Sequence, residues 1–295
     1  MTVTDATTRT IEAPGATVTY DVRPGGSPEI PPLFLIGSPM GAAGFASLAG
    51  HFPDRTIITY DPRGAERSTK DDPTSASNPD QHADDLHRII QEIGGPVDLF
   101  ASSGGAVNAL ALVAKHPDDV RILVAHEPPL ASVLPDSENA KAVVRAMGDT
   151  YQRGGFGAGM AHFIAVTSHR GPFPDDFASQ PAPDPAAFGM PTEDNGDRTD
   201  VLLAQNIIGT THYEPDFDVL GHASTRIICA AGAESQGEMA NRGGYAVAER
   251  LGQQPVIFPS HHGGFLGGEY GWGGDPDAFA AKLREVLDAE ARRWS

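Results

Sequence analysis

The sequence predicts an α/β fold in which helices cover both faces of a mostly parallel sheet. Short apolar runs typical of buried strands alternate along the chain with segments whose apolar residues recur at helical spacing. This alternation indicates a parallel sheet, because parallel strands need long crossover connections that helices usually supply. A chain of 295 residues, of which 40% are hydrophobic, can bury the core of one such domain.

Strands are expected where short apolar runs lie between turn residues. Residues 17–22 (TVTYDV) follow the turn-like APGA, which predicts an early antiparallel hairpin. The next runs are largely apolar, as expected of strands that are buried on both faces. The strands after the hairpin are expected at 32–37, 56–61, 97–101, 121–125, 226–231 and 254–259.

Helices are expected between these strands, at 79–95, at roughly 104–116 and at 277–287. Residues 131–222 interrupt the alternation with two helical patches and a stretch rich in proline and aspartate. An insertion after the strand at 121–125 predicts a mainly helical lid over a site at the strand ends. The core domain is then expected to comprise residues 1–130 and 223–295.

The composition narrows the classes of partner. The formal net charge of −18 repels phosphate backbones and anionic lipid surfaces, so we expect neither nucleic acid nor membrane as a partner. The chain shows no basic leader and no apolar window of about 18 residues, so a cytoplasmic location is expected. The single cysteine, Cys229, lies in an apolar run and is expected to be a small buried residue. No pattern indicates an oligomeric state.

The most informative stretch is residues 96–117, where two serines and two glycines separate an apolar run from a helical segment. A nucleophile elbow needs small residues two positions before and after its serine, because the turn from strand to helix is sharp. Centring the turn on Ser103 gives Ala101 and Gly105, whereas centring it on Ser102 places a phenylalanine at the tight crossing. Ser103 is therefore the expected nucleophile.

The start of the following helix suggests how negative charge would be stabilised. The N–H of Gly104 is expected to face the oxyanion, and the helix dipole favours a negative charge at that end.

A serine hydroxyl needs a base to remove its proton, and the base needs a carboxylate to orient its ring. Among eleven histidines, the pair His261 and His262 follows the last expected strand, where the topology returns a loop to the elbow. Two acids lie between the serine and this pair in the chain, Glu127 and Glu234, each after an expected strand. The proline after Glu127 favours an extended backbone that holds the carboxylate at the sheet edge. On these residues alone, both acids are candidates.

Other histidines are given structural roles. His126 is expected to be a packing or solvent-facing neighbour of the acid, and His261 a solvent-facing neighbour of His262. Nothing else in the chain has ligand spacing to complement the histidine pair, so no metal and no cofactor are expected.

Three stretches, in this order along the chain, resemble the α/β-hydrolase superfamily. Residues 33–45 (LFLIGSPMGAAGF) resemble its strand and oxyanion loop, with Ile-Gly in place of the usual His-Gly. Residues 59–68 (TYDPRGAERS) resemble its D-x-x-G-x-G-x-S turn, with Glu66 at the second glycine. Residues 259–265 (PSHHGGF) resemble its histidine loop. The resemblance covers nearly the whole chain and implies the α/β-hydrolase fold, a mostly parallel eight-stranded sheet with a lid.

The resemblance also implies roles for particular residues. The family's histidine loop places the base at His262, and its oxyanion loop adds the amide of Ser38 as a donor. Its commonest acid position, in G-x-x-D, is occupied here by Ser235, one residue after Glu234. The layout A-S-S-G followed by A-H-E-P instead resembles lactone hydrolases of the zearalenone-degrading type, which carry the acid after the earlier strand. Glu127 is therefore the expected acid, and Glu234 is the alternative.

The expected function is that of a serine hydrolase that cleaves a small-molecule carboxylic ester or lactone through an acyl-enzyme. An acyl transferase, a carbon–carbon bond hydrolase and a cofactor-free perhydrolase would use the same triad. A ligand-binding protein without catalytic activity on this fold is a further alternative, because a fold does not fix a function.

Overall fold

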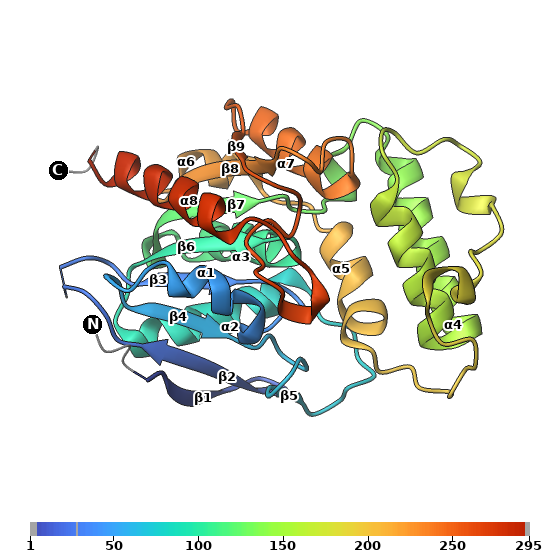
Figure 1. Ribbon diagram of the computed structural model, residues 1–295, viewed down its shortest axis with the longest axis horizontal. Helices are drawn as coiled ribbons and strands as arrows, with labels where there is room; N and C mark the ends of the chain where they lie inside the picture. The colour runs from blue at the N-terminus through green and yellow to red at the C-terminus, as the bar shows by residue number, and fades with distance from the viewer. Residues whose placement is uncertain (1–4, 28, 293–295) are drawn as a thin grey trace.

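A nine-stranded sheet forms the centre of the structure (Figure 1). The computed structural model describes residues 5–27 and 29–292. The strands lie in the order β1-β2-β4-β3-β6-β7-β8-β9, and β5 pairs with β2. The pairs that β2 forms are antiparallel, and every pair from β4 onward in this order is parallel. The bounds are β1 Thr7–Ala13, β2 Ala16–Arg23, β3 Leu33–Ile36, β4 Ile57–Tyr60, β5 Thr69–Lys70, β6 Val97–Ser102, β7 Val120–His126, β8 Arg226–Gly232 and β9 Val256–Phe258.

The strands expected from the sequence are all present, and the fold class is confirmed. The early hairpin is formed by β1 and β2, whose turn contains Gly15 at φ 74°. Every residue of β3 and β6 is buried, as expected of strands that are covered on both faces. The one charged residue among them, Asp98, forms ion pairs with Arg55 and Arg121. The two-residue strand β5 was not predicted and accounts for the ninth strand.

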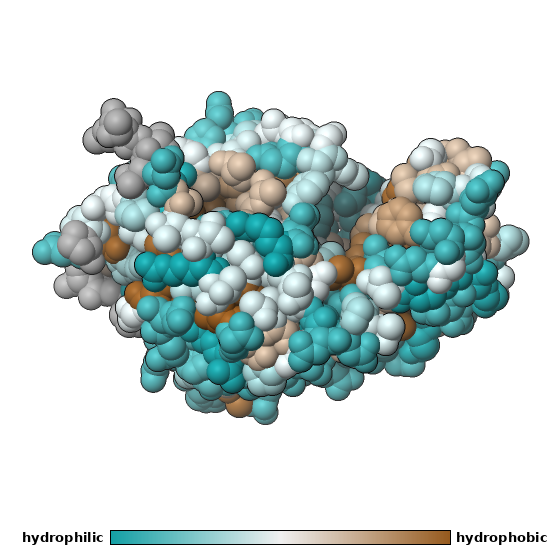
Figure 2. All heavy atoms as spheres, turned by 90° about the horizontal axis from the view of Figure 1, so that it is seen from below, coloured by the Kyte–Doolittle hydropathy of each residue, from teal (hydrophilic) through white to brown (hydrophobic). Residues whose placement is uncertain are grey.

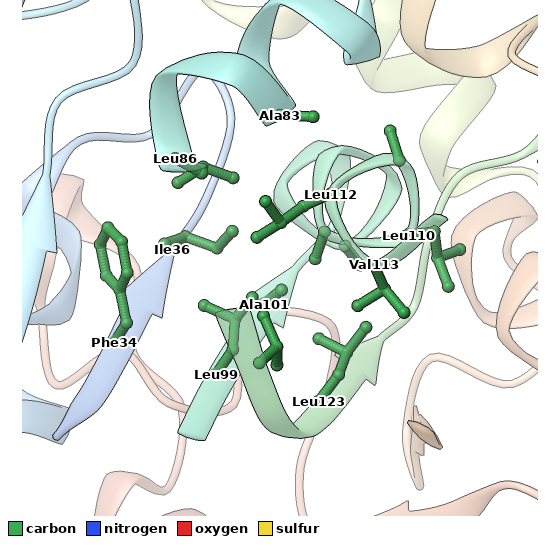
Figure 3. Packing of buried hydrophobic residues seen from close by; sticks show 14 of the residues in the cluster. Phe34, Ile36, Ala83, Leu86, Leu99, Ala101, Leu110, Leu112, Val113 and Leu123 are labelled. Atoms are coloured by element: carbon green, nitrogen blue, oxygen red, sulfur yellow. The ribbon is translucent and has the colours of Figure 1, made fainter. Parts of the chain in front are cut away.

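Helices cover both faces of the sheet. Side chains of α2 (Pro79–Ile93), α3 (Gly104–Lys115) and α7 (Met239–Arg250) pack on one face, and those of α1 (Ala46–Gly50) and α8 (Pro276–Ala291) on the other. Figure 1 shows α1 and α8 in front of the strands. Figure 3 shows residues of α2 and α3 packed against those of β3, β6 and β7. The parallel strands are thus buried from both sides, as the sequence predicts.

The helix α2 illustrates how local sequence sets an element's ends. Asn78 and Gln81 form a capping box at its start, in which each side chain accepts a hydrogen bond from the other residue's backbone N–H. Gly94 ends the helix in the left-handed conformation, with φ 78°, which glycine adopts without steric penalty. The predicted helix is confirmed, and it ends at Ile93.

Residues 131–222 leave the sheet after β7 and return to it at β8. Their principal elements are α4 (Ser137–Ser168), α5 (Ile207–Thr211) and α6 (Phe217–His222). The two expected helical patches join into the single helix α4, which is kinked at Gly155, where φ is 76°. Val143, Val144 and Met147 of α4 belong to a small hydrophobic cluster that is separate from the two clusters on the sheet. In Figure 1, α4 lies to one side of the sheet.

The insertion is anchored to the core by polar contacts. The ring of His82 on α2 hydrogen-bonds Asn206 Oδ1 through Nε2 at 2.8 Å, and burial lowers the pKa of His82 to about 4. The guanidinium of Arg170 donates to the carbonyls of Gln236 and Glu234 at 2.9 and 3.0 Å. These contacts tie the insertion to two separate parts of the core.

The helix α7 was not predicted, because two consecutive glycines interrupt its sequence. The structure explains them by close packing. A Cβ atom added at Gly243 would lie 2.0 Å from the carbonyl oxygen of Pro128, and one at Gly244 would lie 3.1 Å from that of Ala230. The glycines therefore let α7 approach the carboxyl ends of β7 and β8. No helix in the described residues is long and apolar enough to cross a bilayer.

We expect Gly243→Ala to lower the free energy of unfolding by about 1–3 kcal/mol, because α7 must move away from Pro128 to admit the methyl group. The measurement is urea unfolding followed by circular dichroism. Gly221→Ala is the matched control, since nothing lies within 4 Å of the added Cβ on α6. Equal losses of stability in the two variants would contradict the close-packing explanation.

Candidate active site

The turn from β6 to α3 has a constrained backbone. Ser102 ends the strand, Gly104 begins the helix, and Ser103 between them has φ 57° and ψ −128°, a conformation that residues other than glycine rarely adopt. A Cβ at Gly105 would lie 2.8 Å from Gly37 Cα, so the helix start needs glycine to pass that loop. Ser103 therefore occupies the apex of a sharp strand-to-helix turn, as predicted.

The loop after β3 lies directly against this turn. A Cβ at Gly104 would be 2.5 Å from the carbonyl oxygen of Ser38, which shows how close the two backbones are. Within residues 5–27 and 29–292, the backbone N–H groups of Ser38 and Gly104 donate to no other residue. The turn and the loop beside it thus each carry one backbone donor without a partner in the described part of the protein.

Glu127 follows β7 directly, and its side chain is completely buried. Oε1 accepts hydrogen bonds from Gly232 N at 2.8 Å, Ser235 Oγ at 2.5 Å and Asn241 Nδ2 at 2.8 Å. Oε2 is 2.6 Å from Nδ1 of His262. A buried charge is tolerated only when it is compensated, and these four donors provide that compensation.

The contact between Glu127 and His262 sets the protonation of both groups. Burial disfavours the charged carboxylate, but the hydrogen bond from His262 and the neighbouring imidazole rings outweigh burial and hold the pKa of Glu127 well below its usual range. Burial likewise disfavours the charged imidazole, but the hydrogen bond and charge of Glu127 outweigh it and raise the pKa of His262. Because Nδ1 donates to a carboxylate, Nε2 of the neutral ring carries the lone pair.

The alternative acid occupies a different environment. Glu234 is exposed, and its backbone N–H donates to the carbonyl of Ser260. Ser235, at the position where the family usually has aspartate, is buried and donates to Glu127. Of the two sequence-predicted acids, the structure brings Glu127 to His262.

Ser235 and Asn241 were not identified from the sequence as site residues. Asn241 lies on α7, a helix that the sequence did not predict, and its amide also donates to the carbonyl of Gly232 at 3.2 Å. The sequence did contain one sign of the role of Ser235. A hydroxyl at a position where an acid is expected can donate a hydrogen bond to an acid elsewhere in the chain.

His126 was expected either to pack beside the acid or to face solvent, and the structure shows that it packs. It is fully buried, its Nδ1 lies 3.1 Å from Ser102 Oγ, and its ring stacks on His262 with centroids 6.0 Å apart. Burial lowers its pKa to about 4, so the ring is neutral near pH 7. Ser102 and His126 are also paired across β6 and β7, one residue before Ser103 and Glu127 respectively. Their contact therefore joins the two strand ends that precede Ser103 and Glu127.

The histidine loop follows β9. His261 is half-buried and hydrogen-bonds Gly273 O through Nε2 at 2.9 Å, so its ring is held within the loop rather than facing solvent freely. His262 is partly exposed on the side away from Glu127, with 35% of its side chain accessible. Among the described residues, no hydrogen bond joins the Ser103 hydroxyl to His262. Such bonds are often long in unliganded sites and tighten when substrate binds.

Three non-glycine residues with positive φ lie where strands end at this site. They are Ser103 after β6, Glu127 after β7 and Ser260 after β9, with φ of 57°, 49° and 69°. Strained backbone conformations of this kind concentrate at functional sites. Figure 2 shows a cleft between the core and the lobe that contains α4, with hydrophobic residues at its walls.

Apolar residues near the site have mixed roles. Phe265 is buried and stacks on Phe45 at 5.3 Å between ring centroids, so it is part of the core. Met40 is partly buried against the same cluster. Phe100 lies in this cluster as well, packed edge-on against Phe265 and Phe279.

His126, Glu127 and His262 also have potential metal-ligand atoms within 4.8 Å of one another. Glu127 and His126 are completely buried, and Oε1 of Glu127 accepts three hydrogen bonds. This enclosed group fits a proton-transfer site better than a metal centre that an ion reaches from solvent.

The chain belongs to the α/β-hydrolase family, whose model, described as alpha/beta hydrolase fold, matches residues 32–225. Among curated proteins, it is similar to the uncharacterized hydrolase YraK of Bacillus subtilis (strain 168). The two are 30% identical over 289 residues, which cover 96% of this chain and 97% of the relative.

Solved structures share the fold. A thermophilic esterase from Thermogutta terrifontis superposes with a TM-score of 0.64 at 20% identity, covering 97% of this chain and 99% of that one. A proline iminopeptidase from Mycobacterium smegmatis gives a TM-score of 0.63 at 18% identity, covering 98% and 100% respectively. At these identities the likeness shows the fold alone.

The two histidines beside Glu127 should titrate on opposite sides of the ordinary histidine value, His262 above it and His126 at about 4. Glu127→Gln keeps the shape of the side chain and removes its charge, so it should lower the pKa of His262. NMR titration of the histidine ring signals measures both values. Glu234→Gln is the control and should leave His262 unchanged.

The raised pKa of His262 makes the stability of the fold depend on pH. A raised pKa in the folded state means that the contact of His262 with Glu127 stabilises the fold fully below the unfolded pKa of histidine. That contribution disappears as the pH rises through the folded pKa of His262. A pKa of His262 that Glu127→Gln leaves in place would contradict the assigned contact.

Proposed function

We propose that this α/β-hydrolase cleaves a carboxylic ester or a lactone through an acyl-enzyme formed on Ser103. The observation that carries the proposal is the 2.6 Å contact between Glu127 and His262, at the sheet edge where Ser103 occupies a strained strand-to-helix turn. A serine, a histidine and a carboxylate in this order along the chain form the triad of such enzymes.

The first half of the reaction forms the acyl-enzyme. Nε2 of His262 takes the proton from the Ser103 hydroxyl as its oxygen attacks the substrate carbonyl. Glu127 holds Nδ1–H and stabilises the imidazolium that forms. His262 then gives the proton to the leaving alcohol oxygen as the carbon–oxygen bond breaks, which leaves the acyl group on Ser103. In a lactone the leaving oxygen stays attached to the acyl chain.

The second half returns the enzyme to its starting state. His262 takes a proton from water, the resulting hydroxide oxygen attacks the acyl carbonyl, and the proton then returns to Ser103 as the acid leaves. In both halves the negative oxygen is expected to accept from the backbone N–H groups of Ser38 and Gly104. No metal or organic cofactor has a step in this sequence.

Residues 131–222 are proposed as the lid of this site. The support is their place in the chain, between the strand that carries Glu127 and β8, and the cleft that Figure 2 shows beside α4. The net charge of −18 disfavours anionic substrates, so an uncharged ester or lactone is the substrate class that we propose.

The alternatives share part of this chemistry. Acyl transfer, carbon–carbon bond hydrolysis and perhydrolysis would use the same three residues with a different acceptor or substrate. A binding protein without catalytic activity would bind a ligand at this site but would not hydrolyse it. The buried, fully compensated Glu127 and its contact with His262 favour a catalytic function, because a binding pocket has no need of an oriented base.

The experiment is a panel of p-nitrophenyl esters of increasing acyl length together with simple δ- and γ-lactones. We expect hydrolysis of short uncharged esters or lactones and a fall in kcat/KM as the acyl chain outgrows the space beneath the lid. Labelling with a fluorophosphonate, followed by peptide mass spectrometry, identifies the reactive serine. Absence of both turnover and labelling would contradict the proposal and favour a binding protein.

Ser103→Ala is expected to lower kcat for ester hydrolysis by roughly 10⁴-fold or more while the protein stays folded, because alanine is no larger than serine and adds no strain to the turn. Ser102→Ala keeps the nucleophile and removes only the contact with His126, so its effect should be mild. Steady-state kinetics on one ester compares the two variants. An inactive Ser102→Ala beside an active Ser103→Ala would move the nucleophile by one residue.

Glu127→Gln is expected to lower kcat by roughly 10⁴-fold, because the amide no longer selects the required tautomer of His262. Glu234→Gln should change kcat by less than about tenfold, as an exposed charge would. Kinetics on the same ester, with circular dichroism as the test of folding, separates the two acids. A disabled Glu234→Gln beside an active Glu127→Gln would transfer the role to Glu234.

A further inference from the structure

A second cluster of ionisable side chains lies at the opposite edge of the sheet from Glu127. It consists of His87 on α2, His116 at the end of α3 and Asp119 in the turn before β7. Their potential ligand atoms all lie within 4.8 Å of one another. Glu127 follows β7 at its other end, and seven strand residues at about 3.3 Å each place the two groups roughly 20 Å apart. The proposed reaction makes no use of this cluster.

We propose that His87, His116 and Asp119 bind one divalent transition-metal ion of the zinc type, which links α2 to the end of α3. Two imidazoles and one carboxylate are a donor set that suits zinc, whereas magnesium and calcium prefer sites built from oxygen atoms. A water molecule would complete four-fold coordination.

The carboxylate is held in place for this role. Asp119 is buried, with 7% of its side chain accessible, and its Oδ2 lies 2.6 Å from Nδ1 of His87. Its other oxygen accepts from Gln91 Nε2 at 2.9 Å, and Gln91 lies one turn after His87 on α2. Hydrogen bonds of this kind, from residues that do not themselves bind the ion, orient ligands in natural metal sites.

The turn that carries Asp119 is anchored on its other side. The carbonyl of Pro117 accepts from Thr225 Oγ1 at 2.8 Å, and Asp118 accepts from Ser224 Oγ at 3.1 Å. The backbone N–H of Asp119 donates to the carbonyl of His116 at 3.1 Å. The turn therefore holds two of the three ligands at a fixed separation.

The two imidazoles lie side by side. The rings of His87 and His116 stack with centroids 3.8 Å apart and planes 10° from parallel. Because the lone pair of an imidazole nitrogen lies in the plane of the ring, at least one ring must turn out of this stack for both to bind one ion. Neutral imidazole is the form that binds metal, and both rings remain about one-third accessible to ions from solvent.

The required movements are confined to side chains. Zinc–ligand bonds of about 2.0–2.1 Å in a tetrahedron place the donor atoms roughly 3.3 Å apart. The pair at 2.6 Å must open by less than about 1 Å, and His116, with 30% of its side chain accessible, must rotate out of the stack. For Nδ1 of a neutral His87 to bind the ion, the ring proton moves to Nε2, because its loss to the solvent would leave an anionic ring. The nearby Asp84, 3.9 Å from His116 Nε2 and paired with Lys115, adds negative charge at the rim.

The test is titration of the full-length, EDTA-treated protein with ZnCl₂ by isothermal calorimetry, with Co²⁺ absorption as a report of coordination. We expect one equivalent to bind with a micromolar or lower Kd, visible Co²⁺ bands of tetrahedral intensity, and a rise in melting temperature. Mg²⁺ should not compete. His116→Ala and Asp119→Asn should each weaken binding at least tenfold.

Two control variants separate this cluster from other histidines. His51→Ala removes a histidine that also faces a carboxylate, Asp277 at 3.3 Å, and His262→Ala removes the histidine near Glu127. Both should bind zinc as the unmodified protein does. Absence of binding at submillimolar zinc would overturn the proposal, as would binding that survives both cluster variants or is lost in His262→Ala. Circular dichroism confirms that each variant is folded. If His116→Ala does not fold, Asp119→Asn still tests the site.

Discussion

The buried carboxylate of Glu127 is the constraint on which the arrangement of the site depends. Its two oxygens accept four hydrogen bonds, which come from the end of β8, the loop after it, α7 and the histidine loop. Removing any one donor would leave part of a charge unpaired inside the protein, where such a group is strongly destabilising. The carboxylate therefore requires four separate segments of the chain to meet at one point.

This requirement explains features that are otherwise unrelated. Gly232 must lack a side chain because a Cβ there would lie 2.6 Å from Ser235 Oγ and 3.3 Å from Glu127 Oε1. The glycines of α7 allow that helix to come close enough for Asn241 to reach the same oxygen. Ser235, on the loop after β8, donates its hydroxyl to the same carboxylate.

Much of the fold and part of the site could be predicted from the sequence. The strands that lead to Ser103 and Glu127 are largely apolar, with the stretches LFA and ILVA at their centres, and the residue pattern around Ser103 predicts a sharp turn, so local information sufficed for both. The helix α7 could not be predicted, because its glycines are favourable only through contact with Pro128, a residue distant in the chain. Asn241 was missed for the same reason. The kinked continuity of α4 likewise depends on Gly155, whose added Cβ would lie 2.3 Å from Asp194 Oδ1.

The positive φ angles at the strand ends limit how stable this protein can become. Each such residue raises the energy of the folded state by roughly 1–3 kcal/mol, and glycine would relieve that strain. At Ser260 the exchange removes only a hydroxymethyl group, but at Ser103 and Glu127 it removes the side chains on which the proposed reaction depends. Selection for thermal tolerance can therefore recover the energy stored at Ser260, whereas the energy stored at the other two positions is inseparable from the chemistry of the site.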